Sequence, residues 1–342
     1  MASGAAPSAS RAVTATDPEQ VRTLLSALAD DSMQGRATGT PGYARAAAVV
    51  EREMRRIGLE PAGDSGYFQR VPIAIRTIVR VRPGTADTLR FTGPTPVRSL
   101  SDLDTVSADR RRIDANVVGM IRGSDPAARD SVVVIGAHLD HVGIGRPVNG
   151  DSIYNGADDD ASGVVAVLGI ARALKQSPPP RRTVIVVAFT GEEVGGIGSR
   201  WYLAHPVFPL ARTVAQLQVE MIGRPDSLAG GAGRAWLTGF ERSTMGEMLR
   251  AAGIPIVADP RPQFDFFRRS DNIAFAYEGI PAHTLSSYNL HTDYHRPSDE
   301  VSTVDFVHMA AVIDAAARAA RILADGPAPQ WVPGGRPDRT RE

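Results

Sequence analysis

Side chains that can bind metals follow three apolar runs of the 342-residue sequence. The run "SVVVIGAHL" leads into a histidine–aspartate–histidine cluster, "RTVIVVAFT" leads into two glutamates, and "VAQLQVEMI" carries a glutamate within apolar surroundings. A carboxylate in such surroundings is costly unless it is paired or bound to a metal. Two further histidines lie in "NLHTDYHRPSDE". In chain order the candidates are His138, Asp140, His141, Glu192, Glu193, Glu220, His291 and His295.

The aspartate triplet of "IYNGADDDASGV" precedes an apolar helical run and needs an explanation of its own. Asp160 or Ser162 can cap that helix, because side-chain oxygens accept hydrogen bonds from the free amides at a helix N-terminus. A cap accounts for one aspartate and not for three. A cation held among the carboxylates would account for the others.

The available ligands are imidazoles and carboxylates, since the sequence contains no cysteine. Mixed nitrogen and oxygen ligands around open positions are typical of catalytic zinc. Two imidazoles with three or more carboxylates are too many for one tetrahedral ion. They suit two ions that share a bridging carboxylate, and one aspartate of the triplet is the expected bridge.

Apolar runs alternate with helical patterns from about residue 130 onward. The near-continuous apolar runs are typical of strands buried on both faces of a sheet. Stretches such as "GVVAVLGIARALK" and "STVDFVHMAAVIDAAARAARILAD" are helical. This alternation predicts a three-layer α/β/α sandwich with a central mixed, mostly parallel β-sheet. Ligand sites in such sheets form at the carboxyl ends of the strands, where the candidates lie.

Two helices are expected near the start of the chain. Asp17 and Thr40 are the expected N-caps, and Pro18 and Pro41 would occupy the first helical positions. Gly58 is the expected C-terminal cap of the second helix.

The expected organisation is a single domain over residues 17–325. Residues 67–122 are rich in β-branched residues and form a β-rich elaboration of short strands and loops. Residues 1–16 are expected to be a disordered leader, and residues 326–342 a disordered tail rich in proline, glycine and arginine.

The composition limits the kinds of partner that we expect for this protein. The 38 basic and 38 acidic side chains give a formal net charge of zero, which offers no support for nucleic acid as a partner. No apolar run has the length of a membrane span. The start of the sequence is polar and rich in small residues, so we expect a secreted or periplasmic protein whose signal peptide has been removed. The oligomeric state is not predicted.

Taken in order, several motifs resemble those of the two-zinc bacterial aminopeptidases, which are relatives of glutamate carboxypeptidase and glutaminyl cyclase. The motifs are "GAHLDH", "NGADDDASG", "FTGEE", "VEMIGR", "SDNIAFAYEGIPA" and "DYHRPSD". The resemblance covers about residues 20–325 and is densest from 130 to 300. It implies hydrolysis of the N-terminal peptide bond of peptides with a free N-terminus, with two Zn²⁺ per chain as cofactors.

The same resemblance implies the metal ligands. His138 and Glu220 would bind separate zinc ions, and Glu193 and His295 would complete the ligand sets of these two ions. Asp158 would be the bridge.

Some details of this ligand set remain open. A cis peptide bond is implied between Asp158 and Asp159. The best-known relatives have aspartate at the position of Glu220, so the second metal site is expected to differ in position or affinity. His295 is favoured as the last ligand by the context "YHxPxD", with His291 as the alternative.

Catalytic roles also follow from the resemblance. Glu192 would be the general base that takes a proton from a water between the two zinc ions and returns it to the leaving amine. Asp140 would hold the ring of His138 through a carboxylate–histidine hydrogen bond. Tyr294 would donate a hydrogen bond to the tetrahedral oxyanion, or alternatively pack at the wall of the site.

The stretch "QFDFFRRSDN" has two interpretations. Phe264, Phe266 and Phe267 would line the pocket for the first side chain of the substrate, or belong to the core. Asp271 is expected to cap the helix that follows.

Three rivals remain. Zinc carboxypeptidases and amide deacylases of the related family usually insert a dimerisation domain, for which residues 220–295 are too few. A glutaminyl cyclase uses one zinc on the same fold, whereas this sequence has the full ligand set. Non-catalytic binding relatives lose ligands or the base, and both are present here.

Overall fold

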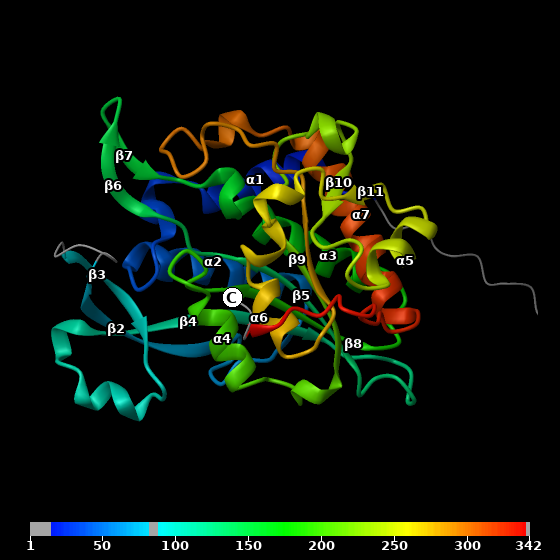
Figure 1. Cartoon of the computed structure of the whole chain (residues 1–342), viewed down its shortest axis with the longest axis horizontal. Coiled ribbons are helices and arrows are strands. Elements are labelled where there is room, and N and C mark those ends of the chain that lie inside the picture. Colours follow the sequence, from blue (N-terminus) through cyan, green and yellow to red (C-terminus); the bar gives the residue numbers. More distant parts are fainter. Residues whose placement is uncertain (1–14, 82–87, 340–342) are drawn as a thin grey trace, which may run out of the picture.

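The computed structural model describes residues 15–81 and 88–339. Most of the expected leader, residues 1–14, therefore lies outside the described residues. Within them the chain forms one ten-stranded sheet and a separate two-stranded hairpin (Figure 1). The strands are β1 (Glu60–Pro61), β2 (Phe68–Val81), β3 (Thr88–Pro96), β4 (Arg111–Ile121), β5 (Val132–His138), β6 (Gly143–Val148), β7 (Asp151–Tyr154), β8 (Thr183–Phe189), β9 (Thr213–Val219), β10 (Ala235–Leu237), β11 (Ile256–Ala258) and β12 (Ala282–Ser286).

The large sheet has the strand order β11-β10-β12-β9-β5-β8-β4-β2-β3, with β1 beside β4. Its centre, β12-β9-β5-β8, is parallel. The strands β4, β2 and β3 continue it in antiparallel pairs on one side, and β10 is antiparallel to β12 on the other. The predicted mixed sheet with a parallel centre is confirmed.

Helices cover both faces of this sheet, which confirms the three-layer sandwich. One face is covered by α1 (Pro18–Leu28), α2 (Pro41–Ile57), α3 (Gly163–Gln176) and α7 (Phe306–Asp325), with α5 (Met245–Ala251) near β11. The other face is covered by α4 (Ile197–Ala204) and α6 (Asn272–Tyr277). None of the helices in the described part of the chain combines the length and apolar character that a membrane span requires.

The central strands are apolar on both sides because both sides are buried. In β5, Val133 and Ile135 pack with the layer of α3 and α7, and Val132 and Val134 pack with the layer of α4 and α6. All four side chains have no exposed surface. Alternation of side chains along a strand therefore ties the two helical layers to one rigid sheet.

The helix boundaries near the N-terminus follow their local signals. Asp17 accepts a hydrogen bond from the amide of Glu19 at the start of α1, and Thr40 accepts one from the amide of Tyr43 at the start of α2. Gly58 ends α2 in the left-handed conformation with φ of 81°. The predicted caps are confirmed.

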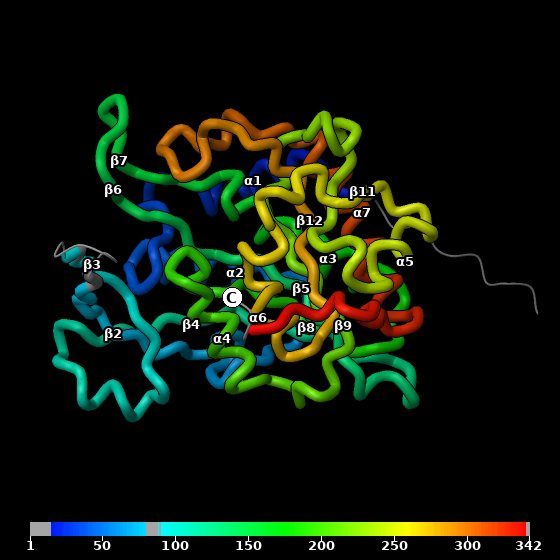
Figure 2. The backbone as a smooth tube through the Cα atoms, viewed as in Figure 1, coloured from blue at the N-terminus to red at the C-terminus, as the bar shows by residue number. Residues whose placement is uncertain are grey.

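Two predictions about the periphery differ from the structure. The β-rich region 67–122, predicted to form short strands and loops, contains long strands, with 14 residues in β2 and 11 in β4, because these strands extend the central sheet. Residues 326–339, predicted to be disordered, lie along α6 near the end of the chain (Figure 2). There Trp331 donates a hydrogen bond to the carbonyl of Gly279 and pairs with Ser243 in a β-bridge, which gives this polar segment fixed partners.

Candidate metal centre

Three parallel strands bring their carboxyl ends to one edge of the sheet. β5 ends at His138, which is paired in register with Phe189 at the end of β8. Glu192 and Glu193 follow β8, and Glu220 follows β9. Because β8 and β9 both pair with β5, side chains that are far apart in the sequence meet here.

Two groups of potential metal ligands form at this edge. In each group the ligand atoms lie within 4.8 Å of one another. The first group consists of His141, Asp159, Glu193 and His295, and the second of His138, Asp159 and Glu220. Asp159 belongs to both groups, so it has the position of a shared carboxylate.

The structure differs here from the arrangement that the resemblance implied. Asp159, and not Asp158, lies between the two groups, with its carboxylate oxygens 3.2 Å from Nε2 of His138 and 3.1 Å from Nε2 of His295. His138 and Glu220 lie in the same group instead of at separate ions, because they end neighbouring strands. The cis peptide bond likewise lies one residue later than predicted, between Asp159 and Asp160.

The carboxylate of Asp158 has other partners. It accepts a hydrogen bond from the amide of Gly223 at 2.6 Å and lies 3.0 Å from Nε2 of His291. His291 is therefore paired with Asp158 and lies outside both ligand groups, whereas His295 lies within one. The geometry favours His295, as the sequence analysis did.

Asp160 stabilises the loop that carries the site. Its carboxylate accepts hydrogen bonds from the amides of His138, Gly163 and Met221, which belong to three different segments. The bond from Gly163 satisfies an amide at the start of α3, as expected of a cap. The three adjacent aspartates thus differ in their contacts, and only Asp159 faces both groups of ligands.

Asp140 supports the site by a different route from the predicted one. Nδ1 of His138 lies 3.0 Å from an oxygen of Asp140, but this oxygen is the backbone carbonyl and does not belong to the carboxylate. The carboxylate instead accepts hydrogen bonds from the amides of Glu192 and Glu193 and from the hydroxyl of Thr38. Asp140 therefore fixes the backbone of both glutamates, because the turn after β8 presents its free amides to that carboxylate.

Two groups that hold the aspartate loop escaped sequence analysis. The carboxylate of Asp299 accepts hydrogen bonds from the amides of Asp158 and Asp159 at 3.0–3.1 Å. Arg36 is fully buried and donates hydrogen bonds to the carbonyl oxygens of Leu28, Leu139, Asn155 and Gly156. Arginine is mostly a surface residue, so nothing in the sequence around Arg36 indicated a buried clamp.

His141 was counted as a possible ligand but received no role from the resemblance. Its ring is buried, and its Nδ1 lies 2.9 Å from the carboxylate of Glu193. The spacing "HxDH" placed it at the end of β5 beside His138, and this was the signal for its position.

The charges of the two groups are strongly coupled. Burial raises the pKa of Asp159, but the nearby rings of His138, His141 and His295 outweigh burial and hold this pKa well below its usual range. Burial lowers the pKa of His295, but the carboxylates of Asp159 and Glu193 raise it to about 10. Burial raises the pKa of Glu220 to about 7.

The carboxylate of Glu192 lies outside both ligand groups. Its backbone is fixed by Asp140, and its side chain lines a cavity beside the ligand groups. Burial, together with the neighbouring carboxylates of Glu220 and Asp271, raises its pKa well above the usual value. A raised pKa is typical of a carboxylate that accepts and returns a proton near neutral pH.

The donor set suits zinc. Nε2 of His138 and of His295 are buried and have no hydrogen-bond partner among the described residues, although oxygens of Asp159 lie 3.2 and 3.1 Å away. Imidazole nitrogens and carboxylate oxygens that converge without hydrogen-bond geometry are typical of ligands around a cation. In the described part of the chain, no lysine or arginine forms an ion pair with Asp159, Glu193 or Glu220, so a cation would offset their charge.

A second, aromatic cavity lies on the Glu220 side of the site. It has a volume of about 30 Å³ and includes Glu220 and Arg269 in its lining. Its other lining residues are Met221, Trp236, Thr238, Phe266, Thr284, Ser286, Tyr288 and Tyr294. We call it the aromatic cavity.

The three phenylalanines of the stretch lie in different environments. Phe266 lines it, Phe267 is packed in the core beside α6, and Phe264 is 43% exposed. Tyr294 also lines it and stacks on the ring of His295 with the centroids 3.9 Å apart. Asp271 precedes α6 but makes no capping hydrogen bond, and its carboxylate accepts one from Gln218 instead.

Two curated relatives with similar sequences are peptidases by name. A probable leucine aminopeptidase 2 from Aspergillus oryzae is 32% identical over 186 residues, which cover 53% of this chain and 35% of that protein. A probable glutamate carboxypeptidase from Arabidopsis thaliana is 32% identical over 168 residues, which cover 48% of this chain and 21% of that protein. The chain thus spans about a third and a fifth of the lengths of these two relatives.

A solved structure supports the fold over nearly the whole chain. A zinc aminopeptidase from Bacillus subtilis is 15% identical, with a TM-score of 0.65, and the alignment covers 92% of this chain and 97% of that one. Residues 116–320, which carry both ligand groups, match peptidase family M28. The chain therefore belongs to peptidase family M28, a family of peptide-bond hydrolases.

Proposed function

We propose that this protein is a zinc-dependent aminopeptidase that binds two Zn²⁺ and uses Glu192 as its general base. The observation that carries the proposal is the pair of ligand groups that share Asp159, with Glu192 beside them. The name of the family supports peptide hydrolysis, and the zinc aminopeptidase of similar fold supports the choice of metal.

Each ligand group would hold one ion, the first through His141, Glu193 and His295 and the second through His138 and Glu220. Asp159 would contribute to both. When bound, such ions polarise a carbonyl and lower the pKa of water toward neutrality. Negative charge is concentrated at this edge of the sheet, and it would also attract the free α-amine of a peptide.

Glu192 would transfer the proton of the attacking water. Its carboxylate accepts the proton of the attacking water and returns it to the leaving amine, and its raised pKa suits both steps. Asp140 holds the backbone of Glu192, so the carboxylate is positioned before the substrate arrives. The hydroxyl of Tyr294 is the proposed donor to the oxyanion, and the stacked ring of His295 limits its motion.

The aromatic cavity would receive the side chain of the first residue of the substrate. Its volume of about 30 Å³ and its wall of Trp236, Phe266 and Tyr288 favour a small apolar side chain. Export to the periplasm or the medium stays a separate prediction from the sequence.

The test measures zinc per chain and hydrolysis of alanine and leucine p-nitroanilides, with and without an N-acetyl group. We expect about two zinc ions per chain and activity only on the free-amine substrates. Glu192→Gln should lower kcat by about 10²–10⁴-fold while zinc is retained, because only proton transfer is removed. Glu247→Gln, an exposed glutamate of α5, is the control.

Other results would point to other functions. Equal activity on acetylated substrates would show that a free amine is not required, and would favour an amide hydrolase over an aminopeptidase. One zinc per chain without peptide hydrolysis would favour a cyclase-like enzyme. Zinc binding without any turnover would favour a non-catalytic relative.

A further inference from the structure

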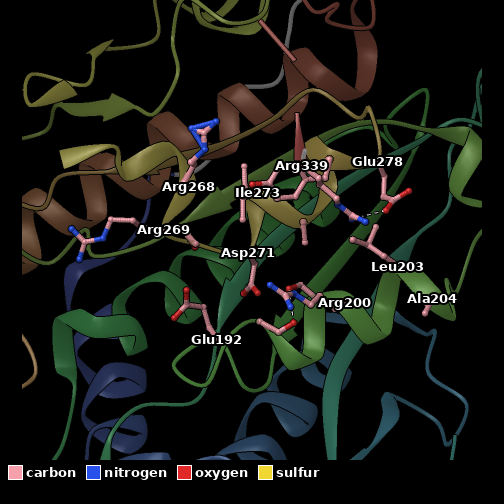
Figure 3. A pocket seen from close by; sticks show the side chains of 16 residues that line it. Glu192, Arg200, Leu203, Ala204, Arg268, Arg269, Asp271, Ile273, Glu278 and Arg339 are labelled. Atoms are coloured by element: carbon pink, nitrogen blue, oxygen red, sulfur yellow. Dashed lines mark hydrogen bonds and ion pairs between the residues drawn. The ribbon is translucent and has the colours of Figure 1, made fainter. Parts of the chain in front are cut away.

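A large cavity includes Glu192 in its lining and none of the residues of the two ligand groups (Figure 3). Its volume is about 680 Å³, within the range of about 300–1,000 Å³ that is typical of pockets for small ligands. Its walls come from the loop after β8, from α4, from the segment that leads into α6, and from the C-terminal segment. Its charged lining residues are Glu192, Arg200, Arg268, Arg269, Asp271, Glu278 and Arg339. We call it the arginine-lined cavity.

The two cavities adjoin each other, because they share a lining residue. Glu220 and Tyr294 line only the aromatic cavity, Glu192 lines only the arginine-lined cavity, and Arg269 lines both. If the first side chain of a peptide occupies the aromatic cavity, the scissile bond lies near Glu192. The leaving part of the substrate then extends into the arginine-lined cavity.

Two of the four arginines are paired with carboxylates of the protein. Arg268 forms an ion pair with Asp265 at 3.2 Å, and Arg339 forms one with Glu278 at 2.8 Å. Within residues 15–81 and 88–339, no carboxylate lies at ion-pair distance from Arg200 or Arg269. The cavity thus presents two cations that the described protein groups leave uncompensated.

Both unpaired arginines are placed to meet a ligand. The guanidinium of Arg269 lies over the ring of Phe266, 5.1 Å from its centroid, which restricts its position at the junction of the two cavities. Arg200 projects from α4, and in the view of Figure 3 it lies on the opposite side of Glu192 and Asp271 from Arg269. Both side chains are exposed and need little rearrangement to reach a bound molecule.

We propose that the arginine-lined cavity binds a carboxylate on the leaving part of the substrate, through Arg200 and Arg269. Guanidinium groups form strong charge-assisted hydrogen bonds with carboxylates. The carboxylates of Glu192 and Asp271 repel an anion close to the reacting bond, so the bound carboxylate lies toward the two arginines. The preferred substrates are short peptides with a free C-terminus or peptides with an acidic second residue. This inference rests on the proposed aminopeptidase function.

The experiment compares kcat/KM within matched pairs of substrates. The first pair is Ala-Leu and Ala-Leu-amide, which differ in the C-terminal carboxylate. The second pair is Ala-Glu-amide and Ala-Gln-amide, which differ in an acidic side chain. The proteins are the zinc-loaded wild type, the double variant Arg200→Gln/Arg269→Gln, and the control Arg212→Gln, an exposed arginine outside both cavities.

In wild type at least one pair should favour the carboxylate substrate by about 10–100-fold, the range for one charge-assisted hydrogen bond. The pair that shows this preference identifies the source of the carboxylate. The double variant should bring that ratio close to one, while Arg212→Gln keeps the wild-type ratio. Thermal unfolding of all three proteins checks that they are folded.

The inference is overturned if both ratios are close to one in wild type, or if the double variant keeps the wild-type ratio. Hydrolysis of the amides with no preference would leave the aminopeptidase proposal intact and remove only this one. Failure to cleave any of the four substrates or a p-nitroanilide would instead reject the proposed function.

Discussion

Replacement of Arg36 by methionine tests whether a buried cation holds the aspartate loop in place. Its guanidinium has no exposed surface and donates to four backbone carbonyls, two of which, those of Asn155 and Gly156, are separated from the aspartate triplet only by Ala157. Methionine has a similar length and fills the space but cannot donate a hydrogen bond. The substitution therefore removes the hydrogen bonds while it largely keeps the packing.

The expected cost follows from those contacts. Hydrogen bonds to a charged group contribute about 1.5–3 kcal/mol each, and the desolvation of the guanidinium offsets part of their sum. Removal of one partner from a buried charged network costs about 3–5 kcal/mol. At about 2.1 cal/mol/K per residue, 342 residues have an unfolding entropy of about 0.7 kcal/mol/K, so a loss of 4 kcal/mol lowers Tm by about 6 °C.

Calorimetry with the metal removed by chelation measures this effect without a contribution from bound zinc. Arg36→Lys should show an intermediate loss, because the ammonium keeps the charge but cannot span all four carbonyls. Arg45→Met is the control, since Arg45 is exposed and bonds a single carbonyl, that of Ser32. A change in Tm of Arg36→Met below about 2 °C, or equal to that of Arg45→Met, would refute the role of Arg36 as a clamp.

Two further predictions concern the shared carboxylate and the response to pH. Asp159→Asn should lower the zinc content from about two ions per chain to one or fewer. Asp158→Asn should retain both ions, because the amide oxygen of asparagine can still accept the hydrogen bond from Gly223. Zinc analysis after dialysis measures the difference, and the reverse pattern would show that Asp158 is the bridge. Burial lowers the pKa of His283 from 6.5 to about 4. The unfolded state therefore binds more protons between those pH values, and stability should fall by about 3 kcal/mol as the pH drops from 6.5 to 4. Urea unfolding of wild type and His283→Gln at several pH values measures this contribution, and an unchanged pH dependence in the variant would contradict it.

Sequence reasoning succeeded where the signal is local. Asp17 and Thr40 cap their helices because an N-cap depends only on a side-chain oxygen and the next few amides. The buried strands were evident because a strand covered on both faces is apolar throughout. Their carboxyl ends then located His138, Glu193 and Glu220 without further information.

The failures share a different cause, which is that the decisive partners are distant in the sequence. Residues 326–339 are polar and rich in proline, yet Trp331 bonds to Gly279, 52 positions away. The hydrogen bonds of Arg36 reach 119 and 120 positions along the chain to Asn155 and Gly156. The hydrophobic periods of a strand (two residues) and of a helix (3.6 residues) carry no information about such contacts.

The aspartate triplet shows that the existence of a site is easier to predict than which of several adjacent residues contributes to it. Three identical carboxylates occur in consecutive positions, so residue type cannot distinguish them. What distinguishes them is backbone direction, which is irregular here: φ and ψ are −105° and 100° at Asp159, and −124° and 38° at Asp160. Because the carboxylate of Asp158 is held by the amide of Gly223 and by His291, and that of Asp160 by three other amides, only the side chain of Asp159 faces both groups of ligands. The metal centre is thus specified by hydrogen bonds to the loop's backbone as much as by the ligands themselves.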